Sequence, residues 1–584
     1  MFDVYVKLAW FFKEHWKRYS LAIALLCLVN VLGVIPARLV GLTIDGIYQN
    51  TLTSETLLFF IILLSVILII DYVASYYWQR YLYGGAFILE KRLRSNIMSH
   101  LLKMTPTFFE RNRTGDLMAR ATNDLKSISA TAGFGILSFT DSVLFTGIII
   151  CMMGITISWE LTLMSIIPLP FMAYAMQVYG KKLHAHFTAA QESFGKLNDS
   201  VLESVSGVRV IRAYVQERQN EKNFAEMTED VYEKNLKVAV IDSLFDPTIK
   251  VLVGISYLIG LGYGAKMVFE QAITLGDLVS FNVYLGMLIW PMFAIGELMN
   301  VMQRGNASLD RVNETLQYKA DVSDSEHVTK EGMNVPEEIT FSDVDFRYPS
   351  STVLNLNDFS VKLMQGETLG IVGKTGSGKT TFIRQLLREY PLGTGAINIS
   401  GHNLEDVSLE DIRGWLGYVP QDSFLFSKSI KENILFGNPS ATVEELDRVI
   451  TLADFKKDLE MLPNGLDTLV GEKGVALSGG QKQRISIARA LIKNPEILLL
   501  DDSLSAVDAK TEKNIIKNIQ SERLGKTTII ATHRMSAVAH ANQVIVLDEG
   551  KIIEAGTHDE LLALGGWYKE QYERQQLEEE MEGK

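Results

Sequence analysis

A glycine-rich segment at residues 373–380 has the composition and spacing of a phosphate-binding loop. It reads GKTGSGKT and follows a β-type run at residues 368–372, which is the strand–loop–helix setting that the pattern G-x-x-x-x-G-K-[ST] requires. Glycines let backbone N–H groups turn toward a phosphate, and the following helix N-terminus adds positive potential. The predicted nucleotide contacts are Gly373, Lys374, Thr375, Gly376, Ser377, Gly378, Lys379, Thr380 and Thr381.

The side chains around this loop indicate a nucleoside triphosphate bound with Mg²⁺. Lys379 is expected to reach the β- and γ-phosphates, and the Thr380 hydroxyl to bind the metal. A second metal ligand is expected at Asp501, because the apolar run at residues 497–500 reads as a buried parallel strand that ends in this acid. The alternative, a carboxylate that merely caps the next turn, has little weight beside the loop. ATP and Mg²⁺ are therefore the predicted cofactors.

A third motif lies between these two, where residues 477–481 read LSGGQ and are followed by KQR. It resembles the signature of ATP-binding-cassette (ABC) proteins, which separates them from other P-loop ATPases. The resemblance implies that a helix N-terminus presents hydrogen-bond donors to the γ-phosphate of an ATP held by a second chain. The residues that this role falls on are Ser478, Gly479, Gly480 and Gln481. The same resemblance implies an adenine-stacking Tyr348, a Q-loop Gln421 that also approaches the metal, an X-loop at Gly471 and Glu472, a D-loop at residues 505–508, and a switch His533.

The first half of the chain is similar to the membrane domains of type IV ABC exporters. Residues 105–109 (TPTFF) and 114–117 (TGDL) resemble their first intracellular loop, and residues 207–214 resemble the region before the second coupling helix. The resemblance implies an all-α transmembrane domain of six helices joined to an α/β P-loop nucleotide-binding domain. It also implies a head-to-tail dimer, since one chain alone supplies only half of each ATP site.

One residue departs from the family pattern. The family places Glu directly after the Walker B aspartate as general base for the attacking water, and this chain has Asp502 there. Asp is one methylene shorter, which retracts the carboxylate by about 1.5 Å, and a misplacement of about 1 Å can cost on the order of a hundredfold in rate. The catalytic residues implied are Asp502, His533 and Gln421, with weak hydrolysis at this chain's own site. A second ABC half-transporter with a competent site is the predicted partner; a homodimer with two slow sites, or an engineered Glu→Asp change, are the alternatives.

Composition narrows the class of protein further. The 584 residues are 47% hydrophobic with a net charge of −13, and the mean hydropathy is +0.12. An acidic chain is unsuited to nucleic acid as its main partner, because phosphate backbones are bound by basic surfaces. Cys27 and Cys151 lie in apolar segments and fit neither a zinc site nor a disulfide framework.

Six apolar segments are long enough to cross the roughly 30 Å hydrocarbon core of a bilayer as helices. They cover residues 20–44, 56–78, 134–157, 160–180, 248–268 and 275–300. Basic residues gather before the first segment and after the second and fourth: Lys7, Lys13, Lys17, Arg18, Lys91, Arg92, Arg94, Arg111, Arg113, Lys181, Lys182, Arg209 and Arg212. By the positive-inside rule, both termini and the nucleotide-binding domain are expected in the cytoplasm of a bacterium, with the chain multi-pass in the plasma membrane. Helical character continues past the second and fourth segments, so these helices are expected to project into the cytosol.

Several acids fall within or near the expected spans: Asp71, Asp141, Asp246 and Glu297. A carboxylate in hydrocarbon costs several kcal/mol, so these side chains are expected to face a cavity or a partner helix. Glu297 and Asp141 could attract cationic substrates; alternatively, they lie at headgroup depth or pair with Arg or Lys. Aromatic and Met side chains of the sixth segment, including Trp290, could line a cavity or equally face lipid or the core.

These observations predict four regions and one function. The regions are a transmembrane domain at residues 1–315, a linker at 316–337, the nucleotide-binding domain at 338–575 and an acidic tail at 576–584. The predicted function is that of a subunit of a heterodimeric, ATP-hydrolysing multidrug exporter that moves hydrophobic or cationic compounds out of the cell. Hydrolysis is expected mainly where this chain's signature meets the partner's Walker motifs. The alternatives are a homodimeric lipid or peptide exporter and a membrane sensor ATPase.

Overall fold

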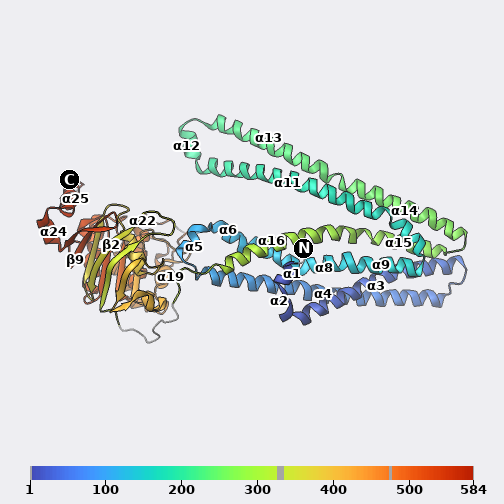
Figure 1. Ribbon diagram of the computed structural model, residues 1–584, viewed down its shortest axis with the longest axis horizontal. Helices are drawn as coiled ribbons and strands as arrows, with labels where there is room; N and C mark the ends of the chain where they lie inside the picture. Colours follow the sequence, from blue (N-terminus) through green and yellow to red (C-terminus); the bar gives the residue numbers. More distant parts are fainter. Residues whose placement is uncertain (1–2, 325–334, 472–475, 583–584) are drawn as a thin grey trace. The chain divides into compact units, whose positions relative to one another are not determined.

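The computed structural model describes residues 3–324, 335–471 and 476–582, and the chain forms two compact units (Figure 1). The first unit comprises residues 1–102 and 114–318, and the second comprises residues 103–113 and 319–584. A short segment of the first predicted intracellular loop therefore belongs to the second unit. Glu472, expected in the X-loop, and residues 325–334 of the expected linker lie outside the described residues.

The first unit is entirely helical. Its main helices are α1 (Asp3–Lys7), α2 (Ala9–Glu14), α3 (Trp16–Tyr48), α4 (Ser54–Leu101), α9 (Thr146–Thr156), α10 (Trp159–Ile166), α11 (Pro168–Ser206), α12 (Val208–Ala213), α13 (Glu217–Asp242), α14 (Phe245–Phe269), α15 (Leu275–Met287) and α16 (Ile289–Gln317). Within the described ranges, five continuous helices are long and apolar enough to cross a membrane: Trp16–Tyr48, Ser54–Leu101, Thr114–Thr156, Trp159–Ser206 and Leu275–Gln317. The segment expected at residues 248–268 corresponds to α14, which is not among these five. Its role as a span stays a prediction.

The helix at Thr114–Thr156 is interrupted by π-helical turns. They lie at Arg120–Asp124 (η1), Thr131–Gly135 (η2) and Thr140–Phe145 (η3), with the short α-helices α6 (Thr114–Ala119), α7 (Leu125–Ala130) and α8 (Ile136–Phe139) before and between them. Such bulges widen the backbone locally and occur frequently at functional sites.

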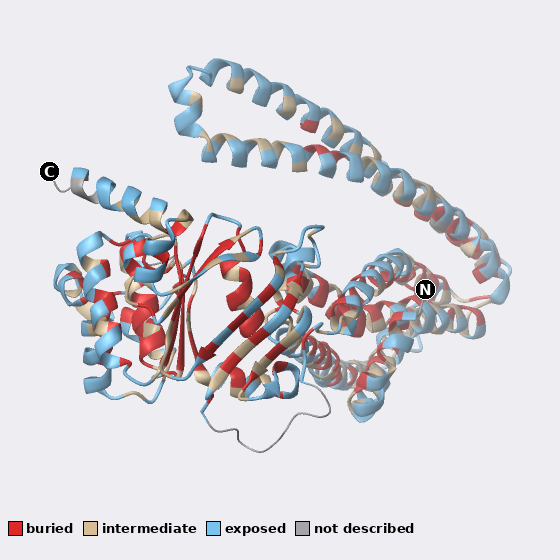
Figure 2. Cartoon of the chain, turned by 60° about the vertical axis from the view of Figure 1, so that its left-hand side comes forward, coloured by how far each residue is buried: buried red, intermediate tan, exposed pale blue. Residues whose placement is uncertain are grey.

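The long helices α11 and α13 run side by side as a hairpin that is capped by α12 (Figure 1). Ser193 of α11 donates to Asp230 of α13 at 2.7 Å, and Lys234 pairs with the same carboxylate at 2.7 Å. Most of the hairpin is exposed (Figure 2), and α12 has no buried residue. The expectation that helical structure continues well beyond the apolar segments is confirmed here and in α4.

The second unit contains two β-sheets. The six-stranded sheet has the order β10-β9-β3-β8-β7-β6, and its strands are β10 (Lys551–Gly556), β9 (Gln543–Asp548), β3 (Thr368–Gly373), β8 (Thr527–Ala531), β7 (Ile497–Asp501) and β6 (Leu416–Val419). All neighbouring strands in it are parallel except the β9–β10 pair. An antiparallel sheet has the order β2-β1-β4-β5 and contains β2 (Leu356–Met364), β1 (Glu338–Phe346), β4 (Thr394–Ile399) and β5 (His402–Asn403).

Strand β7 shows why the parallel sheet is buried on both faces (Figure 2). Its five residues are all buried. Ile497 and Leu499 pack into one hydrophobic cluster and Leu498 and Leu500 into another, because successive side chains of a strand point to opposite faces. Because β3, β8 and β7 are neighbouring parallel strands, their carboxyl ends meet at one edge of the sheet. Ligands of open α/β sheets are bound at this edge.

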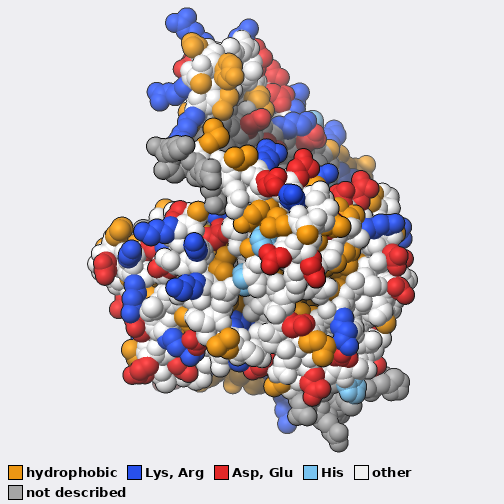
Figure 3. Space-filling view, turned by 90° about the vertical axis from the view of Figure 1, so that its left-hand side faces the viewer, with side chains coloured by type: hydrophobic (Ala, Val, Ile, Leu, Met, Phe, Trp, Pro, Cys, Tyr) orange, Lys and Arg blue, Asp and Glu red, His pale blue; other side chains and the backbone are white. Residues whose placement is uncertain are grey.

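The remaining helices of this unit cover the sheets. They include α5 (Pro106–Arg111), α17 (Lys379–Leu386), α18 (Leu409–Trp415), α19 (Ile430–Leu435), α20 (Val443–Leu452), α21 (Lys456–Met461), α22 (Gly479–Leu491), α23 (Ala509–Glu522), α24 (His558–Leu564) and α25 (Trp567–Glu582). On the face shown in Figure 3, basic and acidic side chains of the described residues are interspersed.

Candidate nucleotide-binding site

The predicted phosphate loop connects β3 to α17, and its backbone has a φ that favours glycine at Gly373, Gly376 and Gly378; at two of these a side chain would also clash. Gly373 has φ +150° and Gly378 has φ +110°. A Cβ atom at Gly373 would lie 2.2 Å from the Leu547 carbonyl oxygen, and one at Gly378 would lie 2.5 Å from that of Asn355. The glycines are therefore required both by the turn and by the close approach of neighbouring backbone.

Lys379 lies inside this loop with only 7% of its surface exposed. Its Nζ donates to the carbonyl oxygens of Gly373 and Lys374, at 2.8 and 2.9 Å. Burial lowers the pKa of Lys379 to about 8, and the carboxylates of Asp502 and Asp501 oppose that shift. The ammonium group is thus held at the centre of the loop, and the nearby carboxylates offset only part of the cost of burying its positive charge.

A buried hydroxyl in the same loop lacks a partner. Ser377 is 3% exposed, and its Oγ makes no hydrogen bond in the structure. An unpaired buried hydroxyl costs free energy, and a phosphate oxygen is the acceptor that such a loop would offer it. The curved backbone, Lys379 and Ser377 together fit a nucleotide phosphate.

Thr380 and Asp501 meet at the position expected for Mg²⁺. The Thr380 Oγ1 donates to Asp501 Oδ1 at 2.9 Å, and Asp501 is 2% exposed at the end of β7. Burial raises the pKa of Asp501, and the hydrogen bond from Thr380 opposes that shift. One hydroxyl and one carboxylate fit Mg²⁺, because this ion takes few protein ligands and completes its shell with phosphates and water. The described residues contain no group of three or more His, Cys, Asp or Glu arranged as a metal site.

Sequence reasoning missed Tyr418, which lies beside the same carboxylate. Its hydroxyl is 3.5 Å from Asp501 Oδ2, and burial raises the pKa of the phenol well above its usual range. The sequence signal that could have identified Tyr418 was its position in a short β-type run, which forms β6 beside the strand that ends in Asp501.

Asp502 and His533 lie on the adjoining loops. Asp502 has the left-handed φ of +45°, and its backbone N–H donates to the Ala531 carbonyl at 2.7 Å. The imidazole of His533 is hydrogen-bonded to the Gly373 backbone, and burial and the charge of Lys379 lower its pKa. The imidazole is therefore neutral at pH 7. The structure brings Asp501, Asp502, His533 and Lys379 close to one another.

Tyr348 lies on the outer side of the loop. Its hydroxyl donates to Thr381 Oγ1 at 3.1 Å, and the Arg384 guanidinium lies 5.8 Å from its ring centroid. Gln421 is different: it is exposed two residues after β6, and within the described ranges its side chain makes no hydrogen bond to Thr380 or Asp501. Its role as a metal ligand remains a prediction.

The predicted signature forms the N-terminus of α22. Ser478 is the N-cap, and its Oγ accepts from the Gln481 N–H at 3.3 Å while the Gln481 side chain accepts from the Ser478 N–H at 2.9 Å. This capping box leaves the Ser478 O–H free to donate. Ser478 and Gly479 are exposed, and Gly480 packs against the Ala506 backbone. In the described part of the chain, no hydrogen bond joins these residues to the phosphate loop.

Gln483 connects the signature helix to the loop after Asp502. Its side chain donates to Ser505 Oγ at 3.2 Å and accepts from the Ala506 N–H at 3.0 Å. Ser505 Oγ donates to the Asp502 carbonyl at 2.9 Å. The expected D-loop therefore links the Walker B end to the signature helix.

A hydrogen bond between residues outside the predicted set joins α5 to the segment that follows α17. Tyr390 donates to Glu110 Oε1 at 2.5 Å, and the Arg384 guanidinium lies 5.8 Å from the ring centroid of Tyr348 and 6.0 Å from that of Tyr390. Glu110, Arg384 and Tyr390 border a cavity of about 530 Å³. Glu110 and Tyr390 are 280 positions apart, so no local sequence pattern could have predicted this pair.

Comparison with known protein families finds a match in each half of the chain. Residues 19–292 match the family described as ABC transporter transmembrane region, and residues 356–505 match the family described as ABC transporter. The chain is 62% identical to a probable multidrug resistance ABC transporter ATP-binding/permease protein, YheI, of Bacillus subtilis, over 99% of this chain and 98% of that protein. It is 40% identical to the multidrug resistance-like ATP-binding protein MdlA of Escherichia coli, over 98% and 97%.

Two further comparisons broaden this range. An ATP-dependent lipid A-core flippase of Syntrophus aciditrophicus is 30% identical over 99% of this chain and 96% of its own length. A solved structure of a bacterial Atm1-family ABC exporter with ATP bound superimposes with a TM-score of 0.79 at 26% identity, covering 96% of this chain and 99% of that one.

Proposed function

The chain belongs to the ABC transporter family as an exporter half-transporter with one membrane region and one ATP-binding domain, and from this premise we propose that it is one subunit of a heterodimeric, ATP-driven multidrug exporter. Its fold is that of the type IV ABC exporters, with a helical transmembrane domain and an α/β nucleotide-binding domain. We also propose that the chain corresponds to the BmrC subunit of the heterodimeric exporter BmrCD, on the basis of the motifs described above.

The observation that carries the proposal is the unequal condition of two half-sites on one chain. The signature helix is intact and exposed at Ser478 and Gly479, whereas the Walker side carries Asp502 where a longer acid is expected. An intact signature is of use only if another chain supplies a Walker site that hydrolyses ATP well. A heterodimeric partner with the full-length Glu is that chain.

The residues of the Walker side are suited to binding rather than to turnover. ATP supplies the phosphoanhydride bond, and Mg²⁺ neutralises charge that develops on its phosphates. The loop N–H groups, Lys379 and Ser377 would hold the phosphates, while Thr380 and Asp501 would hold the metal. His533, neutral at pH 7, would accept or donate a hydrogen bond at the γ-phosphate. Asp502 would have to orient the attacking water from a position about 1.5 Å too far back.

Closure of the dimer is the step through which ATP would act on the membrane helices. ATP shifts an equilibrium only if it binds the closed state better than the open one. A nucleotide between two chains would bind the closed state better, because only there do both chains supply hydrogen-bond donors to it. Helices α4 and α11, which extend beyond their apolar segments, would carry that motion to the spans.

Hydrophobic and cationic small molecules are the substrate class we propose, with export from the cytoplasm. The names of the relatives at 62% and 40% identity support a multidrug role for this chain. The flippase at 30% identity makes a lipid exporter the second candidate. We further propose that residues 1–315 form the transmembrane domain and residues 338–575 the nucleotide-binding domain, with both termini cytoplasmic.

Two measurements test the proposal. Purification of the tagged chain from its native host should recover a second half-transporter in equal amount. Proteoliposomes that contain both chains should accumulate a fluorescent hydrophobic cation upon addition of ATP and Mg²⁺ to the side of the nucleotide-binding domains. Recovery of the chain alone, as a homodimer with full ATP turnover, would refute the heterodimer. Transport of a labelled phospholipid, with no transport of the cation, would favour the lipid exporter.

A further inference from the structure

The switch loop, defined here as residues 533–536, is attached through two of its side chains to a buried acid of α23. Ser536 Oγ donates to Glu512 Oε1 at 3.0 Å, and the Arg534 guanidinium pairs with the same carboxylate. Glu512 is 3% exposed. Arg534 also donates to the Ser505 carbonyl oxygen at 3.2 Å. The side chains that flank His533 on the C-terminal side are therefore fixed within the nucleotide-binding unit.

A second attachment holds the backbone of the switch loop and comes from Gln575 of α25. Gln575 Nε2 donates to the His533 carbonyl oxygen at 2.8 Å, and Gln575 Oε1 accepts from the Met535 N–H at 2.8 Å. Met535 begins the 3₁₀-helix η6 (Met535–Ala537), and the first N–H groups of a helix have no partner within it. Over the described ranges, these two backbone atoms make no other hydrogen bond. One amide side chain thus holds the backbone on both sides of Arg534.

Helix α25 is itself anchored at its N-terminus, which fixes the position of Gln575. The backbone N–H groups of Trp567 and Tyr568 donate to the two carboxylate oxygens of Glu554, at 2.5 and 3.1 Å. Tyr568 is fully buried, and its hydroxyl lies 2.8 Å from His558 Nδ1. Gln575 follows Tyr568 by seven residues, or two helical turns, and therefore lies on the same face of α25.

The double hydrogen bond matters because of where the His533 side chain lies. Its imidazole is hydrogen-bonded to the Gly373 backbone and is close enough to Lys379 for that charge to lower its pKa. The ring is therefore at the phosphate loop. Because the direction of the Cα–Cβ bond follows from the backbone, a backbone held at two points fixes the ring more closely than one held at a single point.

We propose that Gln575 is a positioning residue for His533 and keeps the imidazole directed at the γ-phosphate of the ATP bound by this chain. This inference rests on the proposed function, in which His533 contacts the γ-phosphate. Without the two hydrogen bonds from Gln575, the imidazole loses its fixed position, whereas Lys379 and the N–H groups of the phosphate loop still hold the β-phosphate. The C-terminal helix thereby contributes to the discrimination between ATP and ADP.

Photolabelling with 8-azido-ATP, in competition with AMP-PNP or ADP and with Mg²⁺ present, tests this selectivity. The full-length chain is used in lipid nanodiscs, together with any half-transporter that co-purifies. Label is measured on this chain alone, so that nucleotide held by a partner's Walker motifs is not counted. Gln575→Met keeps the length of the side chain and removes both polar atoms. It should weaken competition by AMP-PNP by about fivefold, equivalent to roughly 1 kcal/mol for one lost hydrogen bond, and leave ADP within about twofold.

Matched variants separate positioning of His533 from simple docking of the helix. Gln576 is the exposed neighbour of Gln575, and its amide donates to the Tyr572 hydroxyl of the same helix at 2.9 Å. Gln576→Met should leave both nucleotides unchanged. Gln575→Asn is too short by one methylene to reach both backbone atoms but keeps the amide, and it should show the same selective loss as Gln575→Met.

A double variant tests whether Gln575 acts through the imidazole. His533→Ala should also weaken AMP-PNP selectively, and adding Gln575→Met to it should cause no further loss, because coupled residues are not additive. Equal losses of AMP-PNP and ADP, no loss in Gln575→Met, the same loss in Gln576→Met, or additive losses in the double variant would each overturn the positioning role.

The result can be distinguished from failure of the proposed function. Recovery of the chain as a homodimer with full ATP turnover would refute the heterodimer and leave a selective loss in Gln575→Met standing. ATP-driven efflux by the unmodified protein, with unchanged nucleotide selectivity in Gln575→Met, would refute the positioning role alone.

Discussion

The phosphate loop and the signature helix lie on the same unit of the protein, yet the structure completes them to different degrees. Around the phosphate loop, Lys379, Thr380 and Asp501 are buried or nearly so and already have hydrogen-bond partners within the chain. At the signature, Ser478 and Gly479 are exposed, and among the described residues Ser478 is hydrogen-bonded only to its own helix. The phosphate loop is thus a site that is built by one chain. The signature is an exposed surface that, in the dimer we propose, completes an ATP site on the partner chain.

The one departure from the expected family pattern, Asp502, lies on the side of the phosphate loop and not at the signature. A carboxylate one methylene short, at Asp502, still leaves a loop that can bind nucleotide. In the heterodimer that we propose, a change at the signature would impair the site on which turnover depends. We therefore expect substitutions at the signature to affect activity most and substitutions at Asp502 to affect it least.

The largest effect is expected from Ser478→Asp. Asp is as good an N-cap as Ser, so α22 should keep its stability to within about 0.5 kcal/mol. The added negative charge would face the γ-phosphate of the partner's ATP, where loss of a single donor typically costs about a hundredfold in rate. Steady-state ATP turnover of the assembled dimer should fall by about that factor.

Thr442→Asp is the matched control for Ser478→Asp, because Thr442 caps α20 with the same capping-box geometry. It should leave turnover unchanged. If the two variants behave alike, the signature of this chain does not face a catalytic site, and the comparison between the two regions fails.

The next effect concerns the rigidity of the phosphate loop. Gly378→Ala combines a φ of +110° with a Cβ that would lie 2.5 Å from the Asn355 carbonyl oxygen. Gly376→Ala has a φ of +84° but meets no atom within 4 Å. We expect Gly378→Ala to lower the free energy of unfolding by about 3 kcal/mol and Gly376→Ala by about 1 kcal/mol. Thermal unfolding of the full-length variants measures both, and equal losses would contradict a rigid preformed loop.

A smaller effect is expected from pH. The pKa of Lys379 is about 8 because of burial, and bound phosphates would raise it, since only the ammonium form is stabilised by them. Nucleotide affinity at this chain's own site should then be full below pH 8 and fall as the pH rises above it, by about fivefold between pH 8 and pH 9. Titration of a fluorescent, non-hydrolysable ATP analogue from pH 7 to 9 measures this dependence.

Lys379→Arg is the control for that titration, because its guanidinium stays charged over the whole range. Its affinity should be lower but flat with pH. A wild-type affinity that does not change between pH 8 and pH 9 would show that the loop does not hold Lys379 as described.

The nucleotide-binding residues were largely predictable because their motifs are local. The loop at residues 373–380 carries its glycines, lysine and threonine within eight positions, and the run that ends in Asp501 is a short buried strand. The apolar helices were equally visible, because a bilayer imposes a length and a composition on each. The helical extension of α4 and α11 followed from the lack of breakers.

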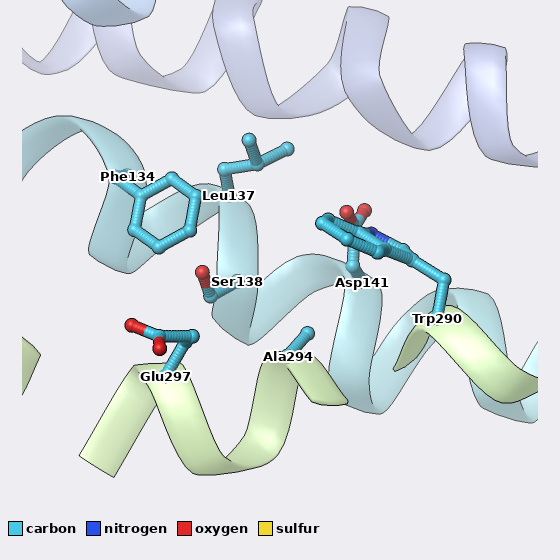
Figure 4. Close-up of a pocket in the computed structure, with 7 residues that line it drawn as sticks. All are labelled: Phe134, Leu137, Ser138, Asp141, Trp290, Ala294 and Glu297. Carbon is cyan, nitrogen blue, oxygen red and sulfur yellow. The ribbon is translucent and has the colours of Figure 1, made fainter. Parts of the chain in front are cut away.

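Contacts between distant segments were not predictable in the same way. Tyr418 reaches Asp501 only because β6 and β7 are neighbours in the sheet, and Glu110 reaches Tyr390 only because α5 packs within the second unit. A cavity of about 360 Å³ at Asp141 lies between the helix at Thr114–Thr156 and α16 (Figure 4), two segments that are far apart in the sequence. Asp141 and Glu297 were notable from the sequence, but the space between them and the position of Trp290 required the structure.

The smallest effect, and the most informative one, is expected at Asp502. Asp502→Asn keeps the size of the side chain and the tolerance of Asn for the φ of +45°, so it removes the base without adding strain. If this site contributes little turnover, the ATPase rate of the dimer should change by less than about twofold, whereas loss of a competent general base costs about a hundredfold or more. Substitution of Gln for the partner's residue at the corresponding position supplies the second half of the measurement. Equal losses from the two substitutions would mean that both sites turn over and that the missing methylene is tolerated.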